Sequence, residues 1–113
     1  MIDESDTQKA SSMLDLWELR GYEMKHIMRQ AGLSTTAFGK LCNRSGRCIV
    51  CVRSENVVKS VWRDRLIDAV GDEFYFRELL VIRDRNGTAS DLLRDHVVAL
   101  NNRRQRRPVE GVV

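Results

Sequence analysis

The segment 33–54 constrains the fold more than any other, because its pattern predicts two short helices joined by a tight turn. In its first half, Phe38, Leu41 and Cys42 recur at spacings of three and four residues, which places them on one face of a helix. The residues 43–46 that follow read Asn-Arg-Ser-Gly, a run of turn-forming types. The segment therefore predicts a helical corner.

A hydroxyl residue is expected to cap the first helix of this corner, and a glycine is expected where the two helices approach most closely. Ser34 or Thr35 is expected to cap the first helix, because a hydroxyl accepts a hydrogen bond from a free backbone N–H of the first turn. Gly39 costs about 1 kcal/mol relative to alanine inside a helix. Its presence predicts a second helix that crosses too closely to leave room for a Cβ.

From residue 47 onward the helical pattern resumes. Ile49 and Val52 lie three residues apart and are expected to face the core. The side chains expected to face outward are Arg47, Val50, Cys51 and Ser54. The second helix is thus expected to present an outer face of mixed polar and apolar character.

The segment resembles the helix-turn-helix of the phage-repressor-like (Xre/Cro-type) class of small bacterial or phage-derived transcription regulators. The resemblance rests on Ala-Phe-Gly at 37–39, the polar turn Asn-Arg-Ser at 43–45, the Ile49/Val52 pair and Arg-Ser-Glu-Asn at 53–56. The turn departs from the class, because Asn stands where glycine is usual and Arg where many members have a hydrophobic residue. The resemblance implies sequence-specific binding of double-stranded DNA in a phage-like or mobile-element circuit.

The resemblance gives the outward side chains roles on DNA. An α-helix fits the major groove, which is about 12 Å wide, and its N-terminal residues reach the base edges. Arg47 is expected to pair with guanine, and Val50 and Cys51 to pack on a thymine methyl group. The base-facing residues are Ser45, Gly46, Arg47, Val50, Cys51 and Ser54. The residues expected to contact phosphate, without reading sequence, are Thr35, Thr36, Lys40, Arg44, Arg53 and Lys59.

Apolar spacing predicts further helices before and after the corner. A helical pattern runs over 12–31, where Gly21 leaves open one bent helix or two segments and Gly32 is the expected C-cap. Trp17 is expected to anchor this pattern in the core. Another helix is expected over 59–70. Its apolar stripe comprises Val58, Val61, Trp62, Leu66, Ile67 and Val70.

The segment 72–85 suits either a helix or short strands at 74–76 and 79–82. We favour a helix, because no partner strand is evident and a lone hairpin is marginally stable. Ser90 is expected to cap a last helix, whose apolar face is Leu92, Leu93, His96, Val97 and Leu100. The expected fold is an all-α bundle containing a helix-turn-helix, with two additional C-terminal helices. Its parts are a disordered N-terminus at 1–11, a DNA-binding domain at 12–71, a helical extension at 72–102 and a basic flexible tail at 103–113.

Charge is distributed unevenly along the 113 residues, whose net charge is only +3. Residues 32–65 carry seven basic and two acidic side chains, a net charge of +5, and residues 100–113 carry +3. Residues 1–31 and 66–99 carry −2 and −3. The positive corner favours a polyanion partner, although such segments also arise by chance. The arginines at 103–107 suit equally a DNA-backbone arm and a solvated end that complements the helix dipole.

The cysteines and histidines do not form a recognisable metal or catalytic pattern. Cys48 and Cys51 form a C-x-x-C with Cys42 upstream, but a structural zinc needs four ligands, and His26 and His96 are distant in sequence. A thiol sensor on the second helix and small semi-buried hydrophobes both fit the cysteines. No Ser/His/Asp set, carboxylate pair or Gly-rich phosphate loop is present. We therefore expect no enzyme and no cofactor.

The expected partners are DNA and a second copy of the chain. No apolar run reaches the roughly 20 residues of a membrane span, and the acidic start lacks a signal-peptide core, so a cytoplasmic, nucleoid-associated protein is expected. A homodimer would place two reading helices at half-sites about 34 Å apart. The candidate dimer or partner surface is Phe74, Leu79, Leu80, Leu93, Val97 and Leu100. The alternative is a helical adaptor that acts on RNA polymerase or another regulator without its own sequence-specific DNA contacts.

Overall fold

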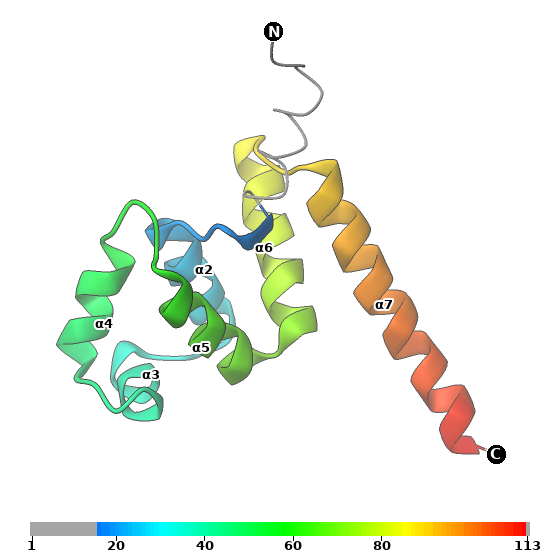
Figure 1. Cartoon of the computed structure of the whole chain (residues 1–113), viewed down its shortest axis with the longest axis horizontal. Coiled ribbons are helices and arrows are strands. Elements are labelled where there is room, and N and C mark those ends of the chain that lie inside the picture. Colours follow the sequence, from blue (N-terminus) through cyan, green and yellow to red (C-terminus); the bar gives the residue numbers. More distant parts are fainter. Residues whose placement is uncertain (1–15, 113) are drawn as a thin grey trace, which may run out of the picture.

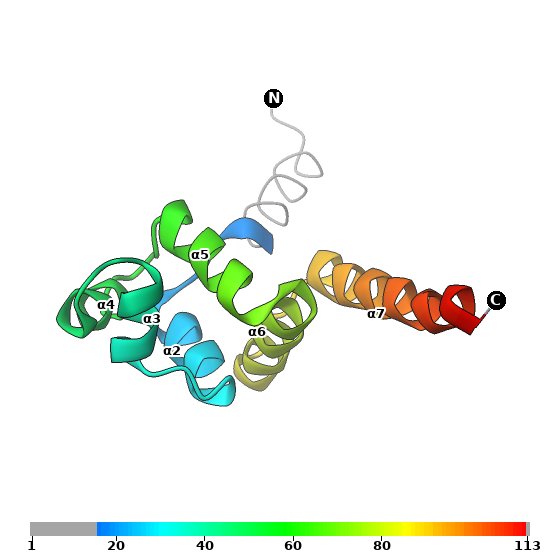
Figure 2. The same ribbon diagram turned by 90° about the horizontal axis from the view of Figure 1, so that it is seen from below.

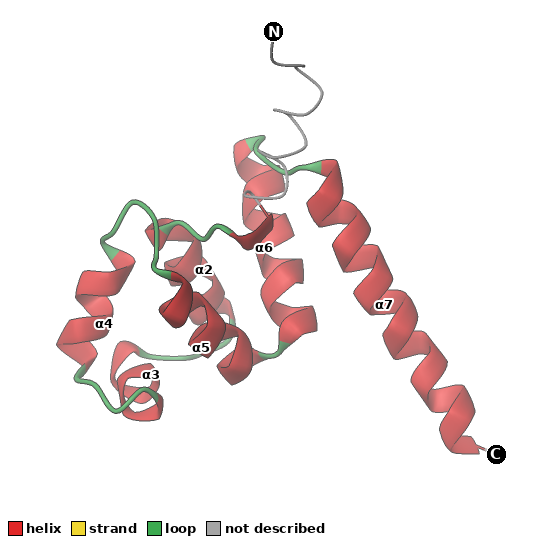
Figure 3. Ribbon diagram, viewed as in Figure 1, coloured by secondary structure: helices red, strands yellow, loops and turns green. Residues whose placement is uncertain are grey.

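The computed structural model describes residues 16–112, with side chains to Arg103. All regular elements in this range are helices, as the secondary-structure colouring of Figure 3 shows, which confirms the all-α class. They are α2 (Gly21–Gln30), α3 (Thr35–Leu41), α4 (Gly46–Arg53), α5 (Ser60–Val70), α6 (Asp72–Asn86) and α7 (Asp91–Val112). The only strand-like pairing in the described part of the chain is an isolated bridge between Arg20 and Val57.

The helices are ordered from one end of the molecule to the other. α3 and α4 lie at one end, α2, α5 and α6 form the middle, and α7 lies at the opposite end (Figures 1 and 2). α3 packs mainly on α4, α2 packs on both α4 and α6, and α7 packs on α6. One core connects these contacts. Its fully buried members include Met24, Ile27, Phe38, Ile49, Leu66, Tyr75, Leu79 and Leu93.

The chain before α2 consists of a separate segment, which resolves one alternative left open by the sequence. Trp17 ends a helical stretch, Leu19 is extended, and its carbonyl accepts a 2.7 Å hydrogen bond from the Val58 N–H. α2 then begins at Gly21, where an added Cβ would overlap the carbonyl oxygens of Arg53 and Glu55. Gly21 therefore allows the start of α2 to pack against the end of α4. The expected disordered stretch 1–11 lies outside the described residues.

Two side chains expected in the core are exposed, and a third is half exposed. Leu41 is 65% exposed, because α3 ends there and its buried face is formed by Phe38 and Cys42. Val61 is 50% exposed in the first turn of α5, whereas Val58 and Leu66 are buried. Trp17 is 47% exposed, so the core-anchor prediction was wrong. Its ring instead contacts the edge of Phe76, with centroids 5.8 Å apart.

The segment 72–85 is helical, as favoured from the sequence. Asp72 and Glu73 lie in the first turn of α6, where acidic side chains complement the positive end of the helix dipole. The helix ends at Gly87, whose φ of 71° is left-handed, and the Thr88 N–H donates to the Arg83 carbonyl over 2.8 Å. These are the hydrogen bond and the conformation of a Schellman cap.

The last helix begins as expected but extends further than expected. The Ser90 hydroxyl accepts a 3.2 Å hydrogen bond from the Leu93 N–H, which confirms the cap. α7 is bounded by Asp91 and Val112, beyond residue 102, where the helical extension was expected to end. The sequence Asn-Asn-Arg-Arg-Gln-Arg-Arg at 101–107 contains no helix breaker, and Arg and Gln favour helices, so composition favours helix as far as the residue before Pro108.

A buried ion pair joins α2 to α6. Glu23 and Arg83 are 1% and 5% exposed, and the Arg83 Nε lies 2.8 Å from the Glu23 Oε2. The Glu23 Oε1 also accepts a hydrogen bond from the Arg20 N–H, and Arg83 donates to the Glu18 carbonyl. Both charges are thus compensated where water is excluded, which burial requires. No feature of the sequence identified this pair.

Candidate nucleic-acid interface

The α3–α4 unit begins each of its helices with a serine cap. The Ser34 hydroxyl accepts a 3.0 Å hydrogen bond from the Ala37 N–H, which selects Ser34 over Thr35 as the cap of α3. The Ser45 hydroxyl accepts from the Cys48 N–H over 3.3 Å at the start of α4. Each hydroxyl satisfies one of the backbone donors that a helix leaves free in its first turn.

The turn between the two helices depends on Asn43. The Arg44 N–H donates to the Gly39 carbonyl over 2.7 Å and the Asn43 N–H donates to the Lys40 carbonyl over 3.2 Å, which is the hydrogen bonding of a Schellman cap. That cap requires a left-handed residue, and Asn43 has φ of 56°. Asn tolerates this conformation better than most non-glycine residues. Asn43 therefore supplies the left-handed residue that closes this turn.

Two glycines allow the helices to pack closely around this turn. A Cβ on Gly39 would lie 2.7 Å from the Arg44 carbonyl oxygen and 3.0 Å from the Ser45 carbonyl carbon. The predicted close approach at Gly39 is confirmed, and the approaching backbone belongs to the turn and to Gly46, the first residue of α4, whose N would lie 3.1 Å from that Cβ. A Cβ on Gly46 would lie 3.2 Å from backbone and side-chain atoms of Thr36. Gly46, predicted to face bases, is half-buried in this contact.

The two faces of α4 differ as the sequence predicts. Ile49 is fully buried and Val52 is 9% exposed, and both pack in the core. On the opposite face Arg47, Cys51 and Ser54 are exposed and Val50 is 45% exposed. The Ser54 hydroxyl donates to the Val50 carbonyl over 2.9 Å, so part of its hydrogen-bonding capacity is used within the helix. Ser45, the remaining predicted base-facing residue, is also exposed.

The residues predicted to contact phosphate come from α4 and from the segments on either side of it. Thr35, Thr36 and Lys40 lie on α3, Arg44 in the turn, Arg53 in the last turn of α4 and Lys59 at the N-cap of α5. Thr36, Lys40, Arg44 and Lys59 are exposed, and Thr35 and Arg53 are half-buried. Among the described residues, none of the five cations Lys40, Arg44, Arg47, Arg53 and Lys59 forms an ion pair.

The position of α4 leaves its outer face accessible. α4 packs on α3 and α2 and lies at the extreme end of the molecule in both views (Figures 1 and 2). Glu55 is the only acidic residue between positions 32 and 63, and it follows the C-terminus of α4. The outer face of α4 is therefore not covered by another described element, and the segment 32–63 that forms the α3–α4 unit contributes a single carboxylate.

The cysteines are free thiols with different exposure. Cys42 is buried, Cys48 is half-buried and Cys51 is exposed. Among residues 16–103 no group of three or more His, Cys, Asp or Glu side chains could hold a metal ion. The exposed thiol of Cys51 lies on the same face of α4 as Arg47.

The two histidines lie away from α4. The His26 Nε2 is 3.2 Å from the Glu78 Oε1 and connects α2 to α6. His96 on α7 packs edge-on against Phe76, with centroids 4.3 Å apart. Burial lowers the pKa of His96, and the nearby Asp72 carboxylate opposes that shift. Both side chains have packing or ion-pair partners.

The surface predicted for a dimer or partner is mostly internal. Leu79, Leu93, Val97 and Leu100 are buried in the core, so the prediction that they form an outer surface was wrong for these four residues. Leu79 on α6 and the other three on α7 belong to the core where α7 packs on α6. Phe74 and Leu80 remain half-buried.

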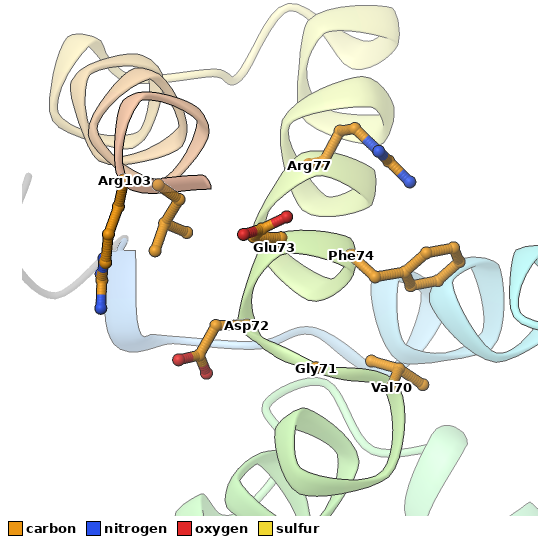
Figure 4. Close-up of a pocket in the computed structure, with 8 residues that line it drawn as sticks. Val70, Gly71, Asp72, Glu73, Phe74, Arg77 and Arg103 are labelled. Carbon is orange, nitrogen blue, oxygen red and sulfur yellow. The ribbon is translucent and has the colours of Figure 1, made fainter. Parts of the chain in front are cut away.

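A groove of about 530 Å³ lies where α5, α6 and α7 meet, and its lining includes Val70, Phe74 and Leu100. In Figure 4, Arg103 comes from α7, whereas the other labelled residues come from the end of α5, the connection at Gly71 and the first turns of α6. The charged lining residues of the groove are of both signs, namely Asp72, Glu73, Arg77 and Arg103.

Comparison with known proteins gives no functional assignment, so function has to be inferred from this geometry. No family model, curated protein or solved structure matches the chain. Among the described residues, no helix has the length and apolar character needed to cross a membrane.

Proposed function

We propose that α3 and α4 form a helix-turn-helix that binds double-stranded DNA sequence-specifically, and that the protein regulates transcription. The observation that carries this proposal is the combination of an uncovered outer face on α4 with five cations around it that form no ion pair with any described residue. Unpaired cations beside an exposed helix are what a phosphate backbone would neutralise.

The proposed contacts follow from position on the two helices. Arg47 is the second residue of α4, and the N-terminal residues of a recognition helix reach the base edges. Val50 and Cys51 supply apolar atoms for a thymine methyl group one turn further along. Lys40 and Arg44 lie on the α3 side of α4, Arg53 lies in its last turn and Lys59 lies beyond its end, and all four would bind phosphates of the flanking strands.

A homodimer acting on DNA in the cytoplasm is part of the proposal. An eight-residue helix reads few base pairs, and a two-fold pair of reading helices doubles the contacts. The groove at Phe74 is the remaining partly apolar surface of the predicted dimer region. The same groove supports the second candidate function, a helical adaptor that binds another transcription protein through α6 and α7.

Selection from a random library of duplex DNA tests the proposal. The purified full chain is mixed with the library at about 50 mM salt, and bound duplexes are recovered and sequenced over several rounds. A DNA-binding protein enriches one motif and binds it with an affinity that falls as salt rises. Absence of binding to any duplex at this salt would exclude the proposal and favour the adaptor.

A further inference from the structure

The first fifteen residues have the opposite charge to the α3–α4 face. They contain Asp3, Glu4, Asp6 and Asp15 but only one basic side chain, Lys9, which gives side-chain charges a sum of −3. This stretch lies outside the described residues. It is the longest part of the chain not yet assigned to any surface.

The cations of the α3–α4 face form no ion pair with a described residue. Arginines elsewhere, such as Arg63, Arg83 and Arg94, do form ion pairs. Glu55, the nearest acidic residue in sequence, also forms no described ion pair. Mutual repulsion of these cations is unrelieved unless an anion binds there.

The chain passes the end of the α3–α4 unit at residues 19 and 20, after Trp17, which contacts Phe76 on α6. The Leu19 carbonyl accepts a hydrogen bond from the Val58 N–H, and the Arg20 guanidinium donates to the Asn56 Oδ1 over 3.1 Å. Both partners lie in the connection between α4 and α5. Fifteen residues span up to about 50 Å when extended, a length comparable to the longest extent of the molecule, 54 Å. The acidic stretch can therefore reach α4.

We propose that residues 1–15 bind the α3–α4 face of their own chain and compete with DNA for it. The competition with DNA rests on the proposed function. The contact between residues 1–15 and the α3–α4 face requires only their opposite charges. A tether of this length gives an effective concentration in the millimolar range, so even weak charge pairing occupies the face part of the time. DNA, with many phosphates, displaces the segment, and the segment raises the concentration of DNA needed for binding.

Two full-chain variants with equal net charge test the competition. Asp3→Asn/Asp6→Asn removes two charges from the N-terminal stretch. Asp68→Asn/Asp95→Asn removes two from exposed side chains of α5 and α7 that form no described ion pair. Fluorescence anisotropy with one labelled duplex measures the affinity of each at low and high salt.

The N-terminal variant should bind DNA about two- to tenfold more tightly than the control variant at about 50 mM salt, the range expected of two exposed charge pairs. The difference should disappear near 1 M salt, where the Debye length is about 3 Å. Equal affinities of the two variants at low salt would overturn the inference while leaving DNA binding intact.

A measurement without DNA separates this inference from the proposed function. In amide NMR spectra at low salt, Asp3→Asn/Asp6→Asn should shift the signals of Lys40, Arg44 and Arg47, and Asp68→Asn/Asp95→Asn should not. Unchanged α3–α4 signals in the N-terminal variant would refute the contact. Shifted signals in a protein that binds no duplex would support the contact and refute the DNA function.

Discussion

Two regions of the molecule use arginine in opposite ways. In the α2–α6 region Arg83 is buried and paired with Glu23, and on α7 Arg94 pairs with Asp84 of α6. On the α3–α4 unit Arg47 and Arg44 are exposed and form no ion pair with any described residue. The same side chain thus holds helices together in one region and remains available for an external anion in the other.

This difference separates stability from binding. A buried charge that loses its partner is left in a medium of low dielectric constant, so its loss destabilises the fold. An exposed unpaired charge contributes little to stability, and its removal changes only what the surface attracts. Substitutions in the two regions should therefore affect different measurements, and four of them test the comparison.

The largest expected effect is on the buried pair. Glu23→Ala leaves the Arg83 guanidinium without its main carboxylate and should lower the free energy of unfolding by about 3–5 kcal/mol. Urea denaturation followed by circular dichroism measures this loss. Glu23→Leu/Arg83→Met, which removes both charges, should recover most of it. A single variant within about 1 kcal/mol of the wild type would show that the pair does not stabilise the fold.

The tight turn of the α3–α4 unit should tolerate added volume poorly. Gly39→Ala places a methyl group 2.7 Å from the Arg44 carbonyl oxygen, which is backbone and cannot rotate away. Strain of this kind costs about 1–3 kcal/mol, more than the helix propensity gained. The measurement is the urea midpoint, with Lys40→Ala on the same helix as the control. A more stable Gly39→Ala protein would contradict the close packing described.

Arg47 should matter for recognition and not for folding. Arg47→Ala should lose about 1–3 kcal/mol of binding to the selected DNA motif, the discrimination typical of a bidentate arginine–guanine contact, with stability unchanged within about 0.5 kcal/mol. Anisotropy titration measures the affinity, and Arg85→Ala on α6 removes an equal charge far along the chain. If the two variants lost affinity equally, Arg47 would have no specific role.

Lys40 should contribute the smallest and least specific effect. Lys40→Ala should weaken binding to the selected motif and to random DNA by the same factor. The slope of log affinity against log salt should fall by about one unit, because one fewer phosphate is neutralised. Titrations at several salt concentrations give this slope. An unchanged slope would place Lys40 off the phosphate backbone.

The sequence predicted local features of the fold well. The caps at Ser34 and Ser90, the inward pair Ile49 and Val52 and the helix at 72–85 all depend on neighbours within a few residues, and all are confirmed. Positions at the margins of a helical stripe were less predictable. Leu41 falls at the end of α3, and whether another helix covers that position is a property of packing and not of spacing.

For the candidate site, the sequence predicted which side chains of α4 face outward but not what surrounds them. Arg47, Val50, Cys51 and Ser54 are exposed as expected. Periodicity alone could not show that the five nearby cations form no ion pair with the described residues, because pairing depends on which helices approach one another. The role of these residues on DNA stays a prediction.

By itself the sequence determined the helices, their caps and the inner and outer sides of α4, since each follows from hydrogen bonding and periodicity within one or two turns. Tertiary structure alone decided that Glu23 meets Arg83 across sixty residues, that Trp17 is half exposed, and that Gly21 is a point of backbone contact with the end of α4. These features depend on the relative placement of helices, which the summed packing of the whole core fixes and no local pattern encodes.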